Sequence, residues 1–202
     1  LCPRLAGHGT TPEDMEHTDA EDWYDSAMDG YALLTGLTKR IAVIGHSMGA
    51  LLALRLAAEK PVERVVTLAA PIFVAEGRGL RYLPPRTESI GRFHPKLRHY
   101  LRDVPALCNL TYKKMPLVAV HELVGLIERV KALLPAVHVP LLLVHSLHDR
   151  TARRDSLHYI YDRVGSQHKE VLWLVRSGHR VMLDAERGTV FRQVTAFLRN
   201  HG

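Results

Sequence analysis

Residues 40–59 decide the fold, and they read RIAVIGHSMGALLALRLAAE. The apolar run 40–44 is typical of a short buried strand, and the alanine- and leucine-rich stretch 48–59 predicts a helix. Between them lies the G-x-S-x-G pattern of residues 45–49, which in this setting predicts a strained turn that exposes the hydroxyl of Ser47. We expect both glycines of the turn to be required, because a side chain on either would clash with neighbouring backbone. The alternative is a glycine-rich turn whose helix start binds an anion.

The same alternation of strand and helix runs through most of the chain. Further strands are predicted over 65–68, 141–145 and 171–175, and further helices over 18–36, 116–134, 156–164 and 185–199. Such alternation is typical of an α/β fold with a parallel sheet. It breaks over 72–138, which contains no strand-like run, so we predict a core of 1–71 and 139–202 and a helical lid over 72–138. Thr18 is the predicted N-cap of the first helix, with Glu21 as its capping-box partner.

The composition fits one globular domain of 202 residues. Apolar residues make up 47% and charged residues 24%, which excludes disordered, collagen-like and disulfide-scaffold proteins. No apolar run approaches the roughly 18 residues that a membrane-spanning helix needs, so we expect no stable membrane insertion. Cys2 and Cys108 have no zinc-ligand spacing, and we predict two free, buried thiols in the reducing cytoplasm, with a disulfide between them as the alternative.

The net charge of +6 comes from one internal segment. Residues 72–138 hold 11 lysines and arginines against 5 aspartates and glutamates, whereas the rest of the chain is balanced. These basic residues are scattered among proline, leucine and valine, so we expect a solvated surface and no nucleic-acid site. No metal or cofactor is expected, and the sequence does not indicate an oligomeric state.

A serine hydroxyl is a useful nucleophile only beside a base that takes its proton and an acid that orients the base. When the serine stands on such a turn, the order along the chain is serine, acid, histidine. Asp149 follows the strand 141–145, whereas its rival Asp155 falls at the start of the next helix. His179 lies in a short loop after the last predicted strand, and we expect Gly178 to give its ring room. Asp149 and His179 are therefore the candidate acid and base.

These motifs resemble those of the α/β-hydrolase superfamily, and most closely those of small bacterial carboxylesterases with a short helical lid and their monoacylglycerol-lipase relatives. The resemblance is carried by Gly7-His-Gly-Thr-Thr-Pro-Glu-Asp14, Asp22-Trp-Tyr24, Gly30-Tyr31, the turn 45–49, Asp149 and residues 177–187. It implies an α/β-hydrolase fold, a mostly parallel sheet with helices on both faces and a lid over the active site. It also implies that Ser47, Asp149 and His179 form a catalytic triad and that the backbone N–H of Met48 is one oxyanion donor.

One part of the family pattern lies outside this sequence. In such enzymes the second oxyanion donor comes from a loop after the third strand, whereas Leu1 corresponds to the end of the fourth. We expect roughly 35–45 further residues upstream in the natural chain, from ordinary strand and loop lengths. A form without that loop would be impaired, because one lost donor costs about 10²–10³ in rate. Around the triad, we expect His46, His148 and Val181 to line the substrate pocket.

The leading hypothesis is a serine hydrolase that cleaves carboxylic esters of small to medium acyl chains through an acyl-enzyme intermediate. A monoacylglycerol lipase, a lysophospholipase or a thioesterase would use the same three residues. An alternative of another class is a catalytically impaired hydrolase fold that serves as a binding module. A chain-length series of esters and thioesters separates the first group, and labelling of Ser47 by a fluorophosphonate separates enzyme from binding module.

Overall fold

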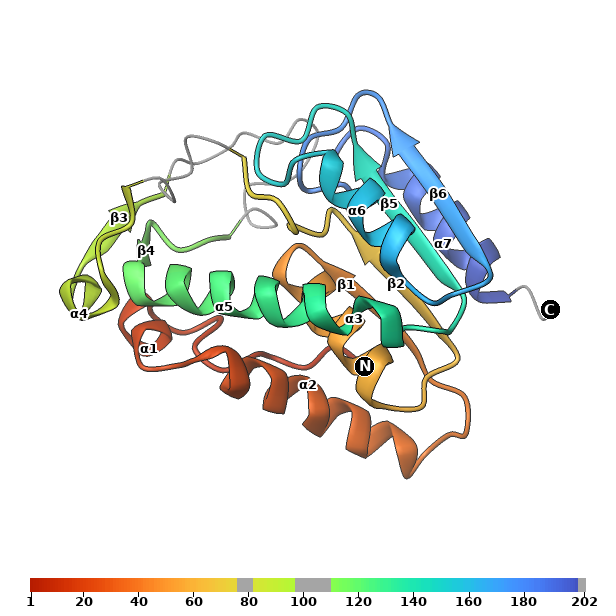
Figure 1. The fold of residues 1–202 in the computed structure, drawn as a ribbon, viewed down its shortest axis with the longest axis horizontal. Coiled ribbons are helices and arrows are strands. Elements are labelled where there is room, and N and C mark those ends of the chain that lie inside the picture. The colour runs from red at the N-terminus through yellow and green to blue at the C-terminus, as the bar shows by residue number, and fades with distance from the viewer. Residues whose placement is uncertain (76–81, 97–109, 200–202) are drawn as a thin grey trace. The chain divides into compact units, whose positions relative to one another are not determined.

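The computed structural model describes residues 1–75, 82–96 and 110–199 (Figure 1). Cys108 and parts of the predicted lid, 76–81 and 97–109, lie outside the described residues. Cys2 is a free thiol as expected, but it is exposed, so the expectation that it is buried is wrong. The chain forms two compact units. Among the described residues, the first unit holds 1–39, 82–96 and 110–128, and the second holds 40–75 and 129–199.

The second unit is built on a four-stranded parallel sheet in the order β1-β2-β5-β6. Its strands are β1 (Ala42–His46), β2 (Arg64–Leu68), β5 (Leu141–Ser146) and β6 (Lys169–Leu174). Every residue of β2 and β5 is buried, which explains why most of their residues are apolar, without the polar alternation of a half-exposed strand. The strands predicted from the sequence are confirmed, with ends that differ by one or two residues.

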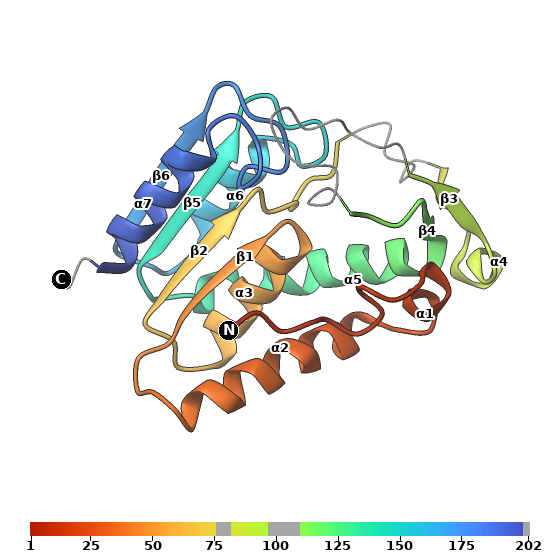
Figure 2. The ribbon, with the colours of Figure 1, turned by 180° about the vertical axis from the view of Figure 1, so that it is seen from behind.

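Helices cover both faces of this sheet (Figures 1 and 2). On one face, Val66, Leu142 and Val144 pack with Val190 and Phe197 of α7 (Arg187–Arg199). The opposite face carries α3 (Met48–Glu59) and α6 (Asp155–Arg163), with the short helix η3 (Leu134–Ala136) beside them. The fold class predicted from the sequence, a parallel sheet between helical layers, is therefore confirmed.

The first unit contains α1 (Pro12–Glu16), α2 (Ala20–Thr35), α4 (Arg86–Ser89), β3 (Phe93–Pro95), β4 (Lys114–Pro116) and most of α5 (Leu117–Leu133). The antiparallel pair β3–β4 corrects the expectation that 72–138 holds no strand. Each of these strands has three residues and includes a proline, so neither produces an apolar run that periodicity could detect. None of the described helices combines the length and apolar character that crossing a membrane requires.

The start of α2 differs from the sequence prediction by one residue. Asp19 is the N-cap, and its carboxylate accepts hydrogen bonds from the N–H groups of Glu21 and Asp22. The carboxylate of Asp22 in turn accepts a hydrogen bond from Asp19 N–H, which completes a capping box. Thr18 instead accepts a hydrogen bond from the indole N–H of buried Trp23 at 3.0 Å, so its hydroxyl is used in packing and not in capping.

Candidate active site

Ser47 sits between β1 and α3 in a backbone conformation that side chains rarely adopt. Its φ is 54° and its ψ is −123°, a left-handed geometry that costs about 1–3 kcal/mol in a residue other than glycine. Its N–H donates to Leu68 O at 2.9 Å, so the sheet's hydrogen bonding continues into the turn. Met48 is the first residue of α3, where backbone N–H groups lack a partner within the helix and the helix dipole favours negative charge.

Only one glycine of the turn is sterically required. A Cβ on Gly45 would lie 2.0 Å from Gly49 O and 2.6 Å from Ala50 Cα, which confirms the expectation for that position. A Cβ on Gly49 would meet nothing within 4 Å outside its own helix, so the expectation of a clash there is wrong. Position 49 already belongs to α3, and its missing side chain would point into open space.

The side chains of Ser47, Asp149 and His179 meet at the carboxyl ends of β1, β5 and β6, all within the second unit. His179 Nε2 lies 2.9 Å from Ser47 Oγ, and His179 Nδ1 lies 2.8 Å from Asp149 Oδ2. A carboxylate only accepts hydrogen bonds, so Nδ1 carries the ring proton and Nε2 is free to accept from the serine hydroxyl. The Asp149 side chain is fully buried, and that of His179 is 17% exposed.

Asp149 is held as a carboxylate. Burial raises its pKa, but the hydrogen bonds with His179 and with the N–H groups of Thr151 and Ala152 lower the pKa by more than burial raises it. The net pKa of Asp149 therefore lies below the ordinary value. Its Oδ1 accepts the two N–H bonds, at 2.7 and 2.9 Å, which leaves Oδ2 to His179. The rival Asp155 begins α6, is 49% exposed and pairs with Arg153, outside this cluster.

His46 binds the loop that carries His179. Its Nε2–H donates to the carbonyl oxygen of His179 at 2.9 Å, and the two rings are 5.0 Å apart between centroids. Burial, assisted by the nearby ring of His179, lowers the pKa of His46 to about 4. His46 is therefore neutral near pH 7, and one ring nitrogen is occupied by this contact.

The other residues expected to line the pocket lie in different surroundings. His148 is exposed, and its backbone N–H donates to Ser146 Oγ at 3.1 Å. Val181 has no exposed surface and belongs to the core cluster with Val66 and Leu142, which gives it a packing role. At Gly178, an added Cβ would make only an ordinary 3.5 Å contact with Asp184, so room for the ring does not require glycine.

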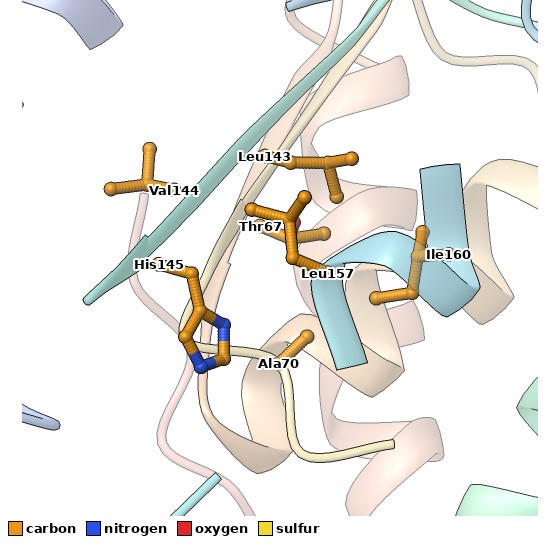
Figure 3. Close-up of a pocket in the computed structure, with 7 residues that line it drawn as sticks. All are labelled: Thr67, Ala70, Leu143, Val144, His145, Leu157 and Ile160. Carbon is orange, nitrogen blue, oxygen red and sulfur yellow. The ribbon is translucent and has the colours of Figure 1, made fainter. Parts of the chain in front are cut away.

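Sequence reasoning missed His145, a buried histidine directly behind the candidate acid. Its Nε2 lies 3.2 Å from Ala152 O and 3.6 Å from Asp149 Oδ2, and burial lowers its pKa. The ring borders a small cavity that is too narrow to admit a water molecule (Figure 3). The cavity is lined by Thr67, Ala70, Leu143, Val144, His145, Leu157 and Ile160. It is a packing gap between sheet and α6 and offers no space for a substrate.

The described part of the chain holds no group of three or more His, Cys, Asp or Glu side chains placed to bind a metal ion. The arrangement can remove a proton from Ser47, keep the resulting imidazolium beside a carboxylate, and offer a backbone N–H to a developing oxyanion.

Comparison with known proteins points in one direction. The sequence model of the alpha/beta hydrolase family matches residues 1–192. A carboxylesterase of Bacillus subtilis (strain 168) is 28% identical over 203 residues, which cover 98% of this chain and 79% of that protein. A thermostable monoacylglycerol lipase of Bacillus sp. (strain H-257) is 32% identical over 204 residues, covering 98% of this chain and 78% of that protein.

Solved structures agree with these sequence matches. A structure from the work on LipS and LipT, two metagenome-derived lipolytic enzymes, has a TM-score of 0.87 at 27% identity and covers 98% of this chain and 81% of that one. The monoacylglycerol lipase of Paleococcus ferrophilus has a TM-score of 0.75 at 17% identity, with coverage of 90% and 76%. The second likeness bears on the fold alone.

Proposed function

Because the chain belongs to the alpha/beta hydrolase family, we propose that it is a serine hydrolase that cleaves carboxylic esters of small to medium acyl chains. The observation that carries the proposal is the hydrogen-bonded series Asp149–His179–Ser47, with contacts of 2.8 and 2.9 Å. These distances lie within the range that proton transfer between side chains requires. The similarity to a carboxylesterase and to lipolytic enzymes supports the same reaction class.

In the proposed mechanism, Ser47 Oγ attacks the acyl carbon while His179 Nε2 takes the serine proton. The tetrahedral oxyanion accepts a hydrogen bond from Met48 N–H. It collapses to an acyl-serine as His179 returns the proton to the leaving alcohol. Water then attacks the acyl-serine with His179 again as the base, and the free acid leaves with Ser47 restored. Throughout, Asp149 keeps the proton on Nδ1 and stabilises the imidazolium.

The test is turnover of p-nitrophenyl esters by the chain and its variants. Ser47→Ala is expected to abolish turnover, since only the hydroxyl supplies the nucleophile. Ser166→Ala is a matched control, because Ser166 also loses a hydroxyl but precedes β6 and lies at the opposite ends of the strands. If Ser47→Ala retained turnover within tenfold of the parent, the assignment would be refuted.

A second candidate is a monoacylglycerol lipase. The relative from Bacillus sp. (strain H-257), at 32% identity, favours it. A series of monoacylglycerols and p-nitrophenyl esters of rising chain length separates the two, and the same series with thioesters and lysophospholipids covers the thioesterase and lysophospholipase alternatives. A chain that binds these compounds while a fluorophosphonate leaves Ser47 unlabelled would instead be a binding module. A small-molecule ester remains the proposed ligand, and a cytoplasmic location remains a prediction.

A further inference from the structure

A buried carboxylate stands behind the loop that carries His179. Glu186 is 9% exposed and directly precedes α7. Its Oε2 accepts hydrogen bonds from Arg176 N–H at 2.8 Å, Ser177 N–H at 2.9 Å and Ser177 Oγ–H at 2.8 Å. Its Oε1 accepts from Val175 N–H at 3.2 Å. A buried carboxylate is expensive unless it is hydrogen-bonded, so this residue commits the loop to one conformation.

The charge of Glu186 is stabilised by these same bonds. Burial raises its pKa, but the hydrogen bonds from Arg176, Ser177 and Val175 outweigh that effect and leave its pKa below the ordinary value. The contact with Ser177 is reciprocal, since Glu186 N–H donates to Ser177 Oγ at 3.1 Å. Glu186 and Ser177 therefore form a closed unit that holds its geometry from both sides.

Two buried hydroxyls extend this unit to the loop of the candidate acid. Ser146, the last residue of β5, donates from Oγ to Ser177 O. The same Ser146 Oγ accepts the N–H of His148 at 3.1 Å, and His148 is the residue before Asp149. Ser146 and Ser177 have no exposed surface. Glu186, Ser177 and Ser146, which we call the loop bracket, thus join the loops that carry Asp149 and His179.

The rest of the histidine loop is held just as closely. Gly178 N–H donates to Asp184 Oδ2 at 2.7 Å, and the carbonyl of His179 accepts from His46 Nε2–H at 2.9 Å. With the bonds of the bracket, each of the four residues 175–178 has its N–H bound to an acidic side chain. The backbone is therefore hydrogen-bonded to a side chain at every residue from 175 to 179.

We propose that Glu186 is a positioning residue for His179, and that the loop bracket sets the contacts of its ring with Asp149 and Ser47. The proposal rests on the proposed function, because a fixed imidazole matters only if it transfers protons. Catalytic groups must stand within about 0.5 Å of their productive positions. A misplacement of about 1 Å by a distant substitution costs up to about 10²-fold in rate. Glu186 touches neither Ser47 nor Asp149 in the described contacts, so its effect passes through the backbone of the loop.

The test uses Glu186→Gln, which keeps the size of the side chain but replaces one acceptor oxygen by an NH₂ group that cannot accept. The expected result is a fall in kcat of about tenfold to a hundredfold, with KM for p-nitrophenyl esters within twofold of the parent. The low-field proton resonance of His179 Nδ1–H, which reports its bond to Asp149, should broaden or disappear. Glu170→Gln is the control, since Glu170 lies in β6, accepts a hydrogen bond from Gln193 Nε2–H at 3.0 Å and contacts His168, and it has no described hydrogen bond with the bracket.

A purely structural role for Glu186 would lower the unfolding midpoint without changing kcat of the folded fraction. The proposal is overturned if Glu186→Gln is folded by circular dichroism and either has kcat within twofold of the parent or keeps the His179 resonance unchanged. If Glu186→Gln does not fold, Ser177→Ala decides in its place, with Ser166→Ala as the buried-hydroxyl control. Ser177→Ala is expected to lower kcat severalfold at unchanged KM, and kcat equal to that of the control would overturn the proposal.

Failure of the proposed function gives a different pattern. It would appear in the parent chain as absent turnover and no labelling of Ser47 by a fluorophosphonate. The His179 resonance does not depend on turnover, so its response to Glu186→Gln still tests the positioning. A resonance that is unchanged by Glu186→Gln in an active parent contradicts the positioning alone.

Discussion

The neutral state of the half-buried His46 makes the folded chain sensitive to mild acid. Its pKa is lowered to about 4, whereas a histidine in an unfolded chain titrates near 6.5. Between these pH values His46 is protonated in the unfolded chain but not in the folded chain, so the free energy of unfolding falls as pH falls. The loss begins near pH 6.5 and ends near pH 4. Over the 1.5 units from pH 6.5 to pH 5, at about 1.4 kcal/mol per unit, it amounts to about 2 kcal/mol.

The perturbation that isolates this effect is His46→Gln, which removes the titrating ring and keeps an N–H donor for His179 O. Urea unfolding of parent and variant at pH 7 and pH 5 gives four free energies of unfolding. The parent is expected to lose about 2 kcal/mol more than the variant on acidification, because all other titrating groups are shared. His94→Gln, which removes an exposed ring from β3, controls for the substitution itself. Equal losses in parent and His46→Gln would refute the reasoning.

Three further predictions concern the turn and the acid. Asp149→Asn should lower kcat by about 10⁴ in the ester assay. The N–H groups that now donate to Oδ1 would hold the amide oxygen, so the amide NH₂ would face His179 Nδ1 and the ring proton of His179 would move to Nε2. Gly45→Ala should destabilise the chain by about 3 kcal/mol in urea unfolding, whereas Gly49→Ala, whose Cβ meets open space, should stabilise it by about 0.5–1 kcal/mol. Ser47→Gly should gain about 1 kcal/mol of stability by relieving the positive φ while turnover is lost, and equal stability of Ser47→Gly and parent would contradict the strain.

The positions of the three candidate catalytic residues could be predicted because they follow from topology. Ser47, Asp149 and His179 each come soon after an apolar run, and in a parallel sheet all carboxyl ends of strands lie at one edge. The run before Asp149 is clear because every residue of β5 is buried, whereas β1 and β6, which precede Ser47 and His179, are only partly buried. The three residues could therefore be placed together from the ends of their strands alone, without knowing the order of the strands in the sheet.

The contacts around that cluster could not be predicted, since they depend on register and strand order. His46 and the carbonyl of His179 are 133 residues apart in sequence, and nothing near either one indicates the partner. The chain has thirteen histidines, so His145 could not be separated from the rest except by its place at the end of a strand, four residues before Asp149. Glu186 resembled any acidic residue at the start of a helix until its four donors were known.

Predictions at single residues were wrong where they assumed a steric clash or a cap without knowledge of the surrounding atoms. Gly49 and Gly178 flank functional side chains, yet the space beside each would accept a methyl group. The cap of α2 moved from Thr18 to Asp19 because both residues can cap, and the hydroxyl of Thr18 is taken by Trp23. Sequence patterns predicted the strands of the second unit, but the choice between neighbouring polar residues is made by packing.

Ser47 and His179 are tied down by different means. Ser47 N–H donates to Leu68 O and so continues the backbone hydrogen bonding of the sheet. The loop that carries His179 is held instead by hydrogen bonds to side chains, such as those from its N–H groups to Glu186. On warming, we expect the loop that carries His179 to become mobile before the sheet unfolds, since loops open locally at lower free energy than core strands. The temperature at which turnover stops is therefore set by the histidine loop and is expected to fall below the melting temperature of the fold, leaving a heat-inactivated enzyme that is still folded and recovers on cooling.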